Sequence, residues 1–162
     1  MHLVVIGLNH KTATVGLREK FALDVSAQKQ GLSKLGDYPE IMEAIILSTC
    51  NRSEIYALCT GKDDAVLSFY TGLAGVKEPQ EHLYKETGEA AVRHLFRVAG
   101  GLDSLVLGEG QILSQVKDAY RLAKEAGAVS TVLNTLFQRA IFVGNRVRQE
   151  TRIAAGAVSV SF

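Results

Sequence analysis

The sequence lacks the features of a membrane-spanning, secreted or metal-stabilised protein. Its 162 residues contain no apolar run near the roughly 18 residues that a membrane helix needs. Only two cysteines are present, and no basic start leads into an apolar stretch, so we expect a reducing compartment and no secretion. The two cysteines and four histidines show no paired short spacing of the zinc-binding kind. We therefore expect neither a membrane nor a metal.

An excess of charge of one sign is also missing. The 18 basic residues nearly balance the 17 acidic ones, which excludes the strong positive field of a dedicated nucleic-acid-binding protein. From Arg121 onward, however, six basic residues face two acidic ones, so this end of the chain is suited to contact with a phosphate backbone. Proline occurs only twice, and no repeat is present. With 47% hydrophobic residues, the chain is expected to form one ordered core.

The hydrophobic pattern predicts an α+β fold with an antiparallel sheet. Helical spacing covers residues 15–35, with Ser26 as the N-cap of the stretch that ends at Gly36, and residues 63–73. The order of elements is β-α-β-β-α-β, the split βαβ arrangement with both helices on one face of the sheet. Strands are expected over residues 3–8, 43–49, 53–60 and, more weakly, 82–86.

From residue 89 the pattern becomes purely helical. Three stretches with apolar residues at helical spacing follow one another, separated by glycines. We expect three parts: the βαββαβ core over residues 1–88, a helical part over 89–152, and the start of a connector over 153–162. The last part is small, polar and β-branched, and it looks like a connector cut short.

Cys50 is the residue best suited to covalent chemistry. It lies in the short turn between the strands expected over 43–49 and 53–60, next to Arg52. A nearby guanidinium favours the thiolate, which is the nucleophilic form and suits attack on an acyl group. The alternative is a cysteine that happens to fall in a turn. Cys59 lies within the strand expected over 53–60, where a free cysteine usually serves as a small buried hydrophobic residue.

Two histidines leave alternatives open. His94 falls at the margin of the apolar arc of its helix, where a half-buried imidazole is either a satisfied boundary residue or a proton relay. His10 follows the first strand, and its loop position fits either local hydrogen bonding or substrate contact.

The stretch after residue 100 carries polar groups but no nucleotide motif. Gly108-Glu109-Gly110 begins like a dinucleotide-binding fingerprint, but its third glycine is missing and no strand precedes it. No cofactor cradle is therefore expected in this chain. The polar groups at the start of the following helix suit recognition of a small zwitterion; they are Asp103, Ser104, Glu109, Gly110, Gln111 and Gln115.

Several long motifs together resemble one family, glutamyl-tRNA reductase, from about residue 6 to the end of the chain. They include Gly7-Leu-Asn-His-Lys-Thr-Ala13, Leu47-Ser-Thr-Cys-Asn-Arg52, His94-Leu-Phe-Arg-Val-Ala99 and Gly101-Leu-Asp-Ser-Leu-Val-Leu-Gly-Glu109. The resemblance implies a ferredoxin-like core followed by helices. It also implies the first step of tetrapyrrole synthesis, in which the glutamyl group of glutamyl-tRNA is reduced with NADPH to glutamate-1-semialdehyde.

The resemblance implies a role for each matching residue. Cys50 matches the nucleophile that forms a thioester with the glutamyl group, and His94 matches a histidine placed to handle a proton. Arg52 fits a carboxylate through two parallel hydrogen bonds, and Glu109 suits a free α-ammonium group. The substrate-binding positions that match are Thr49, Asn51, Arg52, Ser104, Glu109, Gly110, Gln111 and Gln115.

The resemblance further implies parts and partners outside this chain. In the family a Rossmann domain that binds NADPH and a helical dimerisation domain follow, so this chain is expected to be the catalytic domain alone. The implied partners are glutamyl-tRNA, a second copy of the full-length protein and glutamate-1-semialdehyde aminotransferase, and the implied location is the cytoplasm or the plastid stroma. Two other functions stay open, an RNA-binding adaptor and a stand-alone cysteine esterase; a thiol between Thr49 and Arg52 has no purpose in an adaptor.

Overall fold

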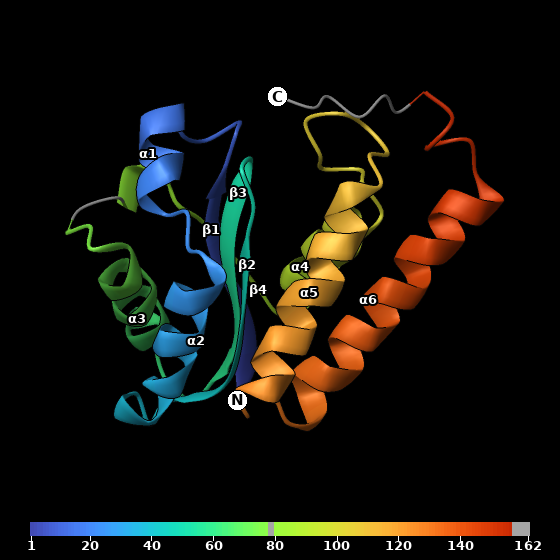
Figure 1. Ribbon diagram of the computed structural model, residues 1–162. Helices are drawn as coiled ribbons and strands as arrows, with labels where there is room; N and C mark the ends of the chain where they lie inside the picture. Colours follow the sequence, from blue (N-terminus) through green and yellow to red (C-terminus); the bar gives the residue numbers. More distant parts are fainter. Residues whose placement is uncertain (78–79, 157–162) are drawn as a thin grey trace.

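The computed structural model describes residues 1–77 and 80–156, and a single antiparallel sheet lies at its centre (Figure 1). Its strands lie in the order β2-β3-β1-β4, so the first and third strands of the sequence are neighbours in the middle. This is the ferredoxin-like topology that the element order predicts. The strands are β1 (His2–Asn9), β2 (Ile41–Ser48), β3 (Arg52–Cys59) and β4 (Tyr84–Thr87).

Helices cover both faces of this sheet. Three lie on one face: α1 (Val15–Lys20), α2 (Val25–Ser33) and α3 (Asp64–Ala74) (Figure 1). Three pack on the other: α4 (Gly88–Ala99), α5 (Gln111–Glu125) and α6 (Thr131–Glu150). Short 3₁₀ turns occur over Leu35–Asp37 and Gln80–His82. The three helices predicted after residue 89 are confirmed, and they form the second layer on the sheet.

The helical spacing over residues 15–35 is divided between two helices, and Ser26 as the N-cap of the stretch that ends at Gly36 is a wrong prediction. The chain leaves α1 at Phe21, whose side chain is fully buried, and a new helix begins after Asp24. The Asp24 carboxylate accepts a hydrogen bond of 2.7 Å from the backbone N–H of Ala27, so Asp24 is the N-cap of α2. Burial of Phe21 against the core outweighs the local preference for a continuous helix.

The expected boundary of the last strand also shifts. Residues predicted to start a strand at 82 instead form the 3₁₀ turn Gln80–His82, and pairing with β1 begins only at Tyr84. The connector expected over 153–162 is described only as far as Gly156, so the rest of it lies outside the described residues.

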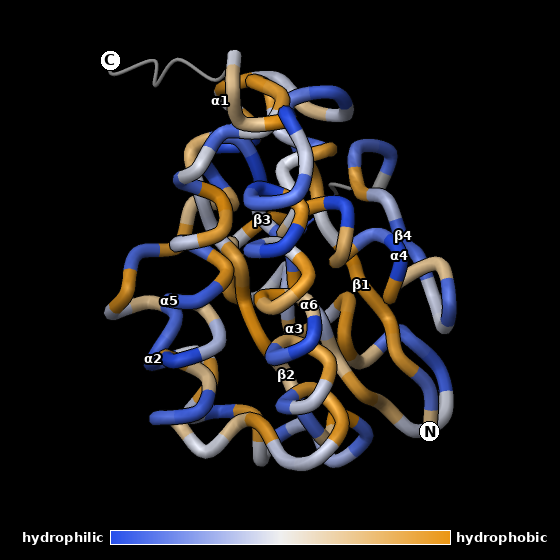
Figure 2. Tube along the Cα trace, turned by 90° about the vertical axis from the view of Figure 1, so that its right-hand side faces the viewer, coloured by the Kyte–Doolittle hydropathy of each residue, from blue (hydrophilic) through white to orange (hydrophobic). Residues whose placement is uncertain are grey.

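The two helix layers bury both faces of the central strands. All eight residues of β3 are buried, and Figure 2 shows a hydrophobic path along β1. One core cluster joins the sheet with the helical part; it includes Val5 of β1, Leu95 of α4 and Phe137 of α6. Residues 89–150 therefore complete the core of the sheet, because without them one face would be open to water.

Polar residues buried in this core have specific partners. Glu43 of β2 is only 3% exposed, and its carboxylate accepts hydrogen bonds from the backbone N–H groups of Ser130, Val132 and Leu133. A strand carboxylate thus caps the start of α6, where the helix dipole also favours a negative charge. Among the residues that the structure describes, no helix combines the length and apolar character needed to cross a bilayer.

Candidate active site

Cys50 is exposed at the tip of the β2–β3 hairpin, as the sequence predicts. The turn is held by Thr49, whose hydroxyl accepts hydrogen bonds from the backbone N–H groups of Asn51 (3.2 Å) and Arg52 (3.1 Å). The backbone N–H of Thr49 donates in turn to the carbonyl of Arg52 at 2.8 Å. A thiol exposed on a turn fixed at both ends is accessible to a large acyl substrate.

The loop after β1 braces this hairpin from the side. Asn9 pairs with Arg52 in the sheet, and the backbone N–H of His10 donates to the carbonyl of Asn51 at 3.0 Å. The Nδ1 atom of His10 is buried without a hydrogen-bond partner among the described residues. Burial, followed by the charges of Arg52 and Lys11, lowers the pKa of His10, so its imidazole is neutral at pH 7. His10 therefore lies beside the hairpin, with Nδ1 unpaired among the residues that the structure describes.

Arg52 extends from the hairpin into a buried network of charged side chains. It is only 2% exposed, and Nη1 donates to Glu54 Oε1 at 2.8 Å. Nη2 donates to both the carbonyl (2.7 Å) and the Oδ2 atom (2.9 Å) of Asp103. The carboxylates of Glu54 and Asp103 therefore offset the positive charge of the guanidinium. This pairing reduces the positive potential that the sequence analysis expects Arg52 to create around Cys50.

Glu54 is the centre of the network and was missed by the sequence analysis. Its side chain is fully buried, and its carboxylate also accepts hydrogen bonds from His94 Nε2 (2.6 Å), Tyr56 (2.6 Å) and Tyr84. Burial raises the pKa of Glu54, but the hydrogen bond from His94 and the charge of Arg52 outweigh it and bring the pKa down to about 2. Glu54 is therefore ionised throughout the physiological range.

His94 is half-buried at the margin of α4, as its position on the helical pattern predicts. Its side chain is 16% exposed, and the ring lies 5.3 Å from that of Tyr84 between ring centroids. Because Nε2 is bound to Glu54, the ring has a fixed orientation and Nδ1 is the nitrogen left to exchange a proton. His94 is joined to the hairpin through the chain of contacts from Glu54 to Arg52.

The loop between α4 and α5 reaches the same end of the sheet. Asp103 binds Arg52, and the hydroxyl of Ser104 is buried with no hydrogen-bond partner in the described part of the chain. Gly101 and Gly108 both have positive φ, and the Gly108 N–H donates to the Gly101 carbonyl at 2.9 Å, which closes the loop. The hydroxyl of Ser104 is therefore an unsatisfied polar group inside a closed loop.

Arg148 of α6 fixes both ends of this loop. Nη1 donates to the carbonyl of Ala99 at 2.7 Å, and Nη2 donates to the carbonyl of Glu109 at 2.8 Å. Arg146, two residues earlier in α6, is paired with Glu150 at 2.8 Å. These two cations of the basic C-terminal part are therefore engaged within the chain, which limits the phosphate contact expected from them.

The remaining positions that the sequence predicts to bind substrate lie around α5. Gly110 is exposed as the N-cap residue of α5, and Gln111 begins the helix. Gln115, one turn further, lines a groove of about 410 Å³ between α2 and α5, together with Ser48 at the end of β2. The structure thus places Thr49, Asn51 and Arg52 in the turn of Cys50, Ser104 next to the Arg52 partner Asp103, and His94 behind them through Glu54. Gln115 lines the groove that also contains Ser48.

Comparisons with known proteins identify the family to which the chain is related. The model of the glutamyl-tRNAGlu reductase N-terminal domain matches residues 6–151. The chain is similar to the glutamyl-tRNA reductases of Pelotomaculum thermopropionicum (48% identity, all of this chain, 38% of the relative) and Gloeothece citriformis (45% identity, 99% of this chain, 39% of the relative). It spans less than two fifths of their length.

A solved structure gives the same result for the fold. Glutamyl-tRNA reductase from Methanopyrus kandleri superimposes with a TM-score of 0.81 at 37% identity, over 97% of this chain and 37% of that protein. The sheet with helices on both faces is thus found in a related protein of known structure. The chain belongs to the family of glutamyl-tRNA reductase N-terminal domains.

Proposed function

We propose that this chain is the catalytic domain of a glutamyl-tRNA reductase and that Cys50 forms a thioester with the glutamyl group. The observation that carries the proposal is the exposed thiol on a braced hairpin, backed by the buried Arg52–Glu54–His94 network. The family membership supplies the substrate class, glutamyl-tRNA. In the full-length enzyme, NADPH held outside this chain would supply the hydride for reduction to glutamate-1-semialdehyde.

The acyl transfer can be written for the residues of this chain alone. The sulfur of Cys50 attacks the ester carbonyl, a carbon–sulfur bond forms, and the bond to the terminal ribose oxygen of the tRNA breaks. The thiol proton ends on that ribose oxygen, so no net proton is gained or lost. We assign the proton transfer to Nδ1 of His94, because Glu54 holds Nε2 and fixes the tautomer.

Unsatisfied polar groups in the loops next to the hairpin support recognition of the glutamyl group. Ser104 offers an unpartnered buried hydroxyl, and His10 offers an unpartnered Nδ1. Arg52 is the proposed ligand of the side-chain carboxylate, which it would bind in addition to Glu54 and Asp103. Glu109, Gly110, Gln111 and Gln115 remain proposed substrate contacts from the side of α5.

NADPH does not fit the residues of this chain. Gly108 closes the loop by its hydrogen bond to Gly101, and a Cβ atom at Gly108 would lie 2.1 Å from the carbonyl oxygen of Ile153, so the backbone of Gly108 is packed against the chain. No dinucleotide cradle is formed there. We propose that the cofactor, and the dimer contacts, belong to parts of the full-length protein outside this chain. The aminotransferase partner is proposed on the family relationship alone.

The chain alone should therefore perform the first half of the reaction. We expect it to release glutamate from glutamyl-tRNA slowly, through a thioester on Cys50 that water hydrolyses, at a rate indifferent to NADPH. Mass spectrometry of the Cys50 peptide and assays of free glutamate and semialdehyde check this. Semialdehyde made by this chain with NADPH would contradict the proposal, and Cys50→Ser provides the control for uncatalysed ester hydrolysis.

Arg52→Lys is expected to lower semialdehyde formation by the full-length enzyme by about 100-fold, the scale of a misplaced reacting group. Lysine keeps the charge but lacks the planar fork that joins Glu54 and Asp103. Arg146→Lys, an exposed arginine with one carboxylate partner, is the matched control and should retain the parent rate. An Arg52→Lys enzyme with the parent rate would remove Arg52 from the substrate site.

A further inference from the structure

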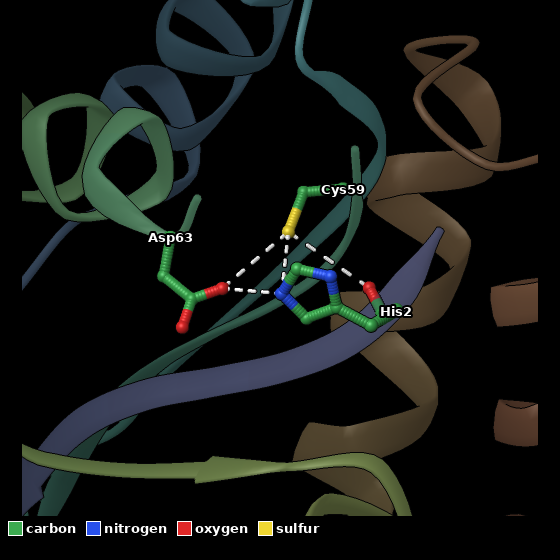
Figure 3. Close-up of side chains that lie close together, drawn as sticks. All are labelled: His2, Cys59 and Asp63. Carbon is green, nitrogen blue, oxygen red and sulfur yellow. Dashed lines mark hydrogen bonds and ion pairs between the residues drawn. The ribbon is translucent and has the colours of Figure 1, made fainter. Parts of the chain in front are cut away.

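Three side chains with metal-binding atoms converge at the end of the sheet opposite Cys50 (Figure 3). His2 and Cys59 pair across β1 and β3, and Asp63 precedes α3. Seven strand positions separate this pair from Asn9 and Arg52, which is about 24 Å along the sheet. The cluster therefore has no part in the proposed acyl transfer, and an inference drawn from it does not depend on that proposal.

The three ligand atoms face a common point. Cys59 Sγ lies 3.4 Å from His2 Nε2 and 3.7 Å from Asp63 Oδ1, and His2 Nε2 lies 2.5 Å from Asp63 Oδ1. In a catalytic triad the imidazole bridges its two partners, with one nitrogen for each. Here the same nitrogen faces both the sulfur and the carboxylate. The arrangement is that of converging ligands and not that of a proton relay.

The separations match a tetrahedral ion of moderate size. Metal–sulfur bonds of about 2.3 Å and metal–nitrogen or metal–oxygen bonds of about 2.0–2.1 Å require ligand atoms roughly 3.3–3.6 Å apart. The two sulfur distances already lie near this range, so only the His2–Asp63 pair must separate. Both side chains have room to do so, since they are 36% and 17% exposed.

Charge and access also favour a divalent cation. A thiolate and a carboxylate together neutralise two positive charges, and neutral imidazole completes a ligand set that suits zinc. Lys85 binds the other carboxylate oxygen of Asp63, Oδ2, at 3.0 Å and leaves Oδ1 directed at the cluster. His2 is 36% exposed, so water can reach a fourth coordination position from its side of the cluster.

We propose that His2 Nε2, Cys59 Sγ and Asp63 Oδ1 bind one zinc ion that clamps β1, β3 and α3 together. Binding releases the thiol proton of Cys59 to the solvent, and His2 coordinates as a neutral imidazole with its proton on Nδ1. The search for short zinc-type spacings could not find this site, because His2 is 57 residues from Cys59 and only the sheet register brings them together.

Cobalt titration of the chain tests the site, with Co²⁺ as a coloured substitute for Zn²⁺. All variants carry Cys50→Ser, which removes the exposed thiol as a competing ligand. We expect one equivalent of Co²⁺, with a thiolate-to-cobalt absorption band and the visible bands of a tetrahedral ion, and displacement by one equivalent of Zn²⁺. At one hundred times its dissociation constant, Zn²⁺ should raise Tm by about 5–10 °C.

The variants assign the ligands. Cys59→Ser should lose the thiolate band, and His2→Ala and Asp63→Asn should each weaken binding at least 10-fold, since even outer-shell partners contribute about 10–100-fold. Asp64→Asn, at the exposed neighbouring carboxylate, is the matched control and should bind as the parent does. Circular dichroism checks that each variant is folded; His2→Ala alters only a partly exposed strand end. No band in the Cys50→Ser chain, or a band that survives in Cys59→Ser, overturns the proposal.

Discussion

Cys50→Ser in the full-length enzyme is expected to lower semialdehyde formation by roughly 10⁴–10⁶-fold, the loss found when a catalytic nucleophile is removed. The hydroxyl of serine stays protonated where a thiol ionises, so the acyl-enzyme no longer forms. The substitution is nearly isosteric on an exposed turn, and the turn is held by Thr49. The free energy of unfolding should therefore stay within about 0.5 kcal/mol of the parent.

Cys59→Ser is the matched control for this experiment. Cys59 is the other free cysteine of the chain, but it is buried at the far end of β3. Burial, with a further contribution from the charge of Asp63, raises the pKa of its thiol to about 11, so it is protonated at neutral pH. We expect the control to retain turnover and to show any effect in thermal unfolding. Equal losses in both variants, or turnover by Cys50→Ser, would remove Cys50 from the nucleophile position.

The strands and the hairpin could be predicted because local pattern determines them. The apolar runs around Val5, Ile45 and Ile55 have strand length, and the few residues between the last two allow only a tight connection. Cys50 then has to lie at the tip. His94 could be placed at a helix margin for the same reason, since helical periodicity fixes which side it faces.

The network behind the hairpin could not be predicted, because distant segments build it. Glu54 lies in a strand whose two faces are both covered, and its partners Tyr84 and His94 are 30 and 40 residues away in the sequence. A glutamate among apolar residues usually marks an exposed strand position. The useful signal was the pair Arg52 and Glu54, which share one face of the strand and can neutralise each other in the core.

Glu54→Leu is expected to destabilise the chain by about 3–5 kcal/mol, because it leaves the Arg52 charge in the core without its main partner. Glu54→Gln keeps the shape and should cost less. It removes the charge that fixes His94, so turnover by the full-length enzyme should fall by about 10²–10⁴-fold, the range of general acid–base catalysis. Glu43→Gln is the matched control, since Glu43 is a buried carboxylate that caps α6. It should lower stability while retaining turnover.

The stability of the parent should also depend on the charge of Glu54 in acid. Its pKa is about 2 in the folded chain and 4.5 when unperturbed, so the unfolded state binds the proton first as the pH falls. This contribution, roughly 3 kcal/mol, is present above about pH 4.5 and is lost progressively down to about pH 2. Arg52, His94, Tyr56 and Tyr84 are the groups that face this carboxylate, and all four remain in Glu54→Gln.

Urea unfolding at pH 6 and pH 3 separates a positioning role from a structural one. We expect the parent to lose more of its free energy of unfolding between the two pH values than Glu54→Gln does, because glutamine has no proton to take up. A catalytic defect in Glu54→Gln together with this flatter pH dependence supports an ionised Glu54 that orients His94. If Glu54→Gln and Glu43→Gln retain turnover equally, the carboxylate supports the fold alone, and His94 must be oriented by its contact with Tyr84.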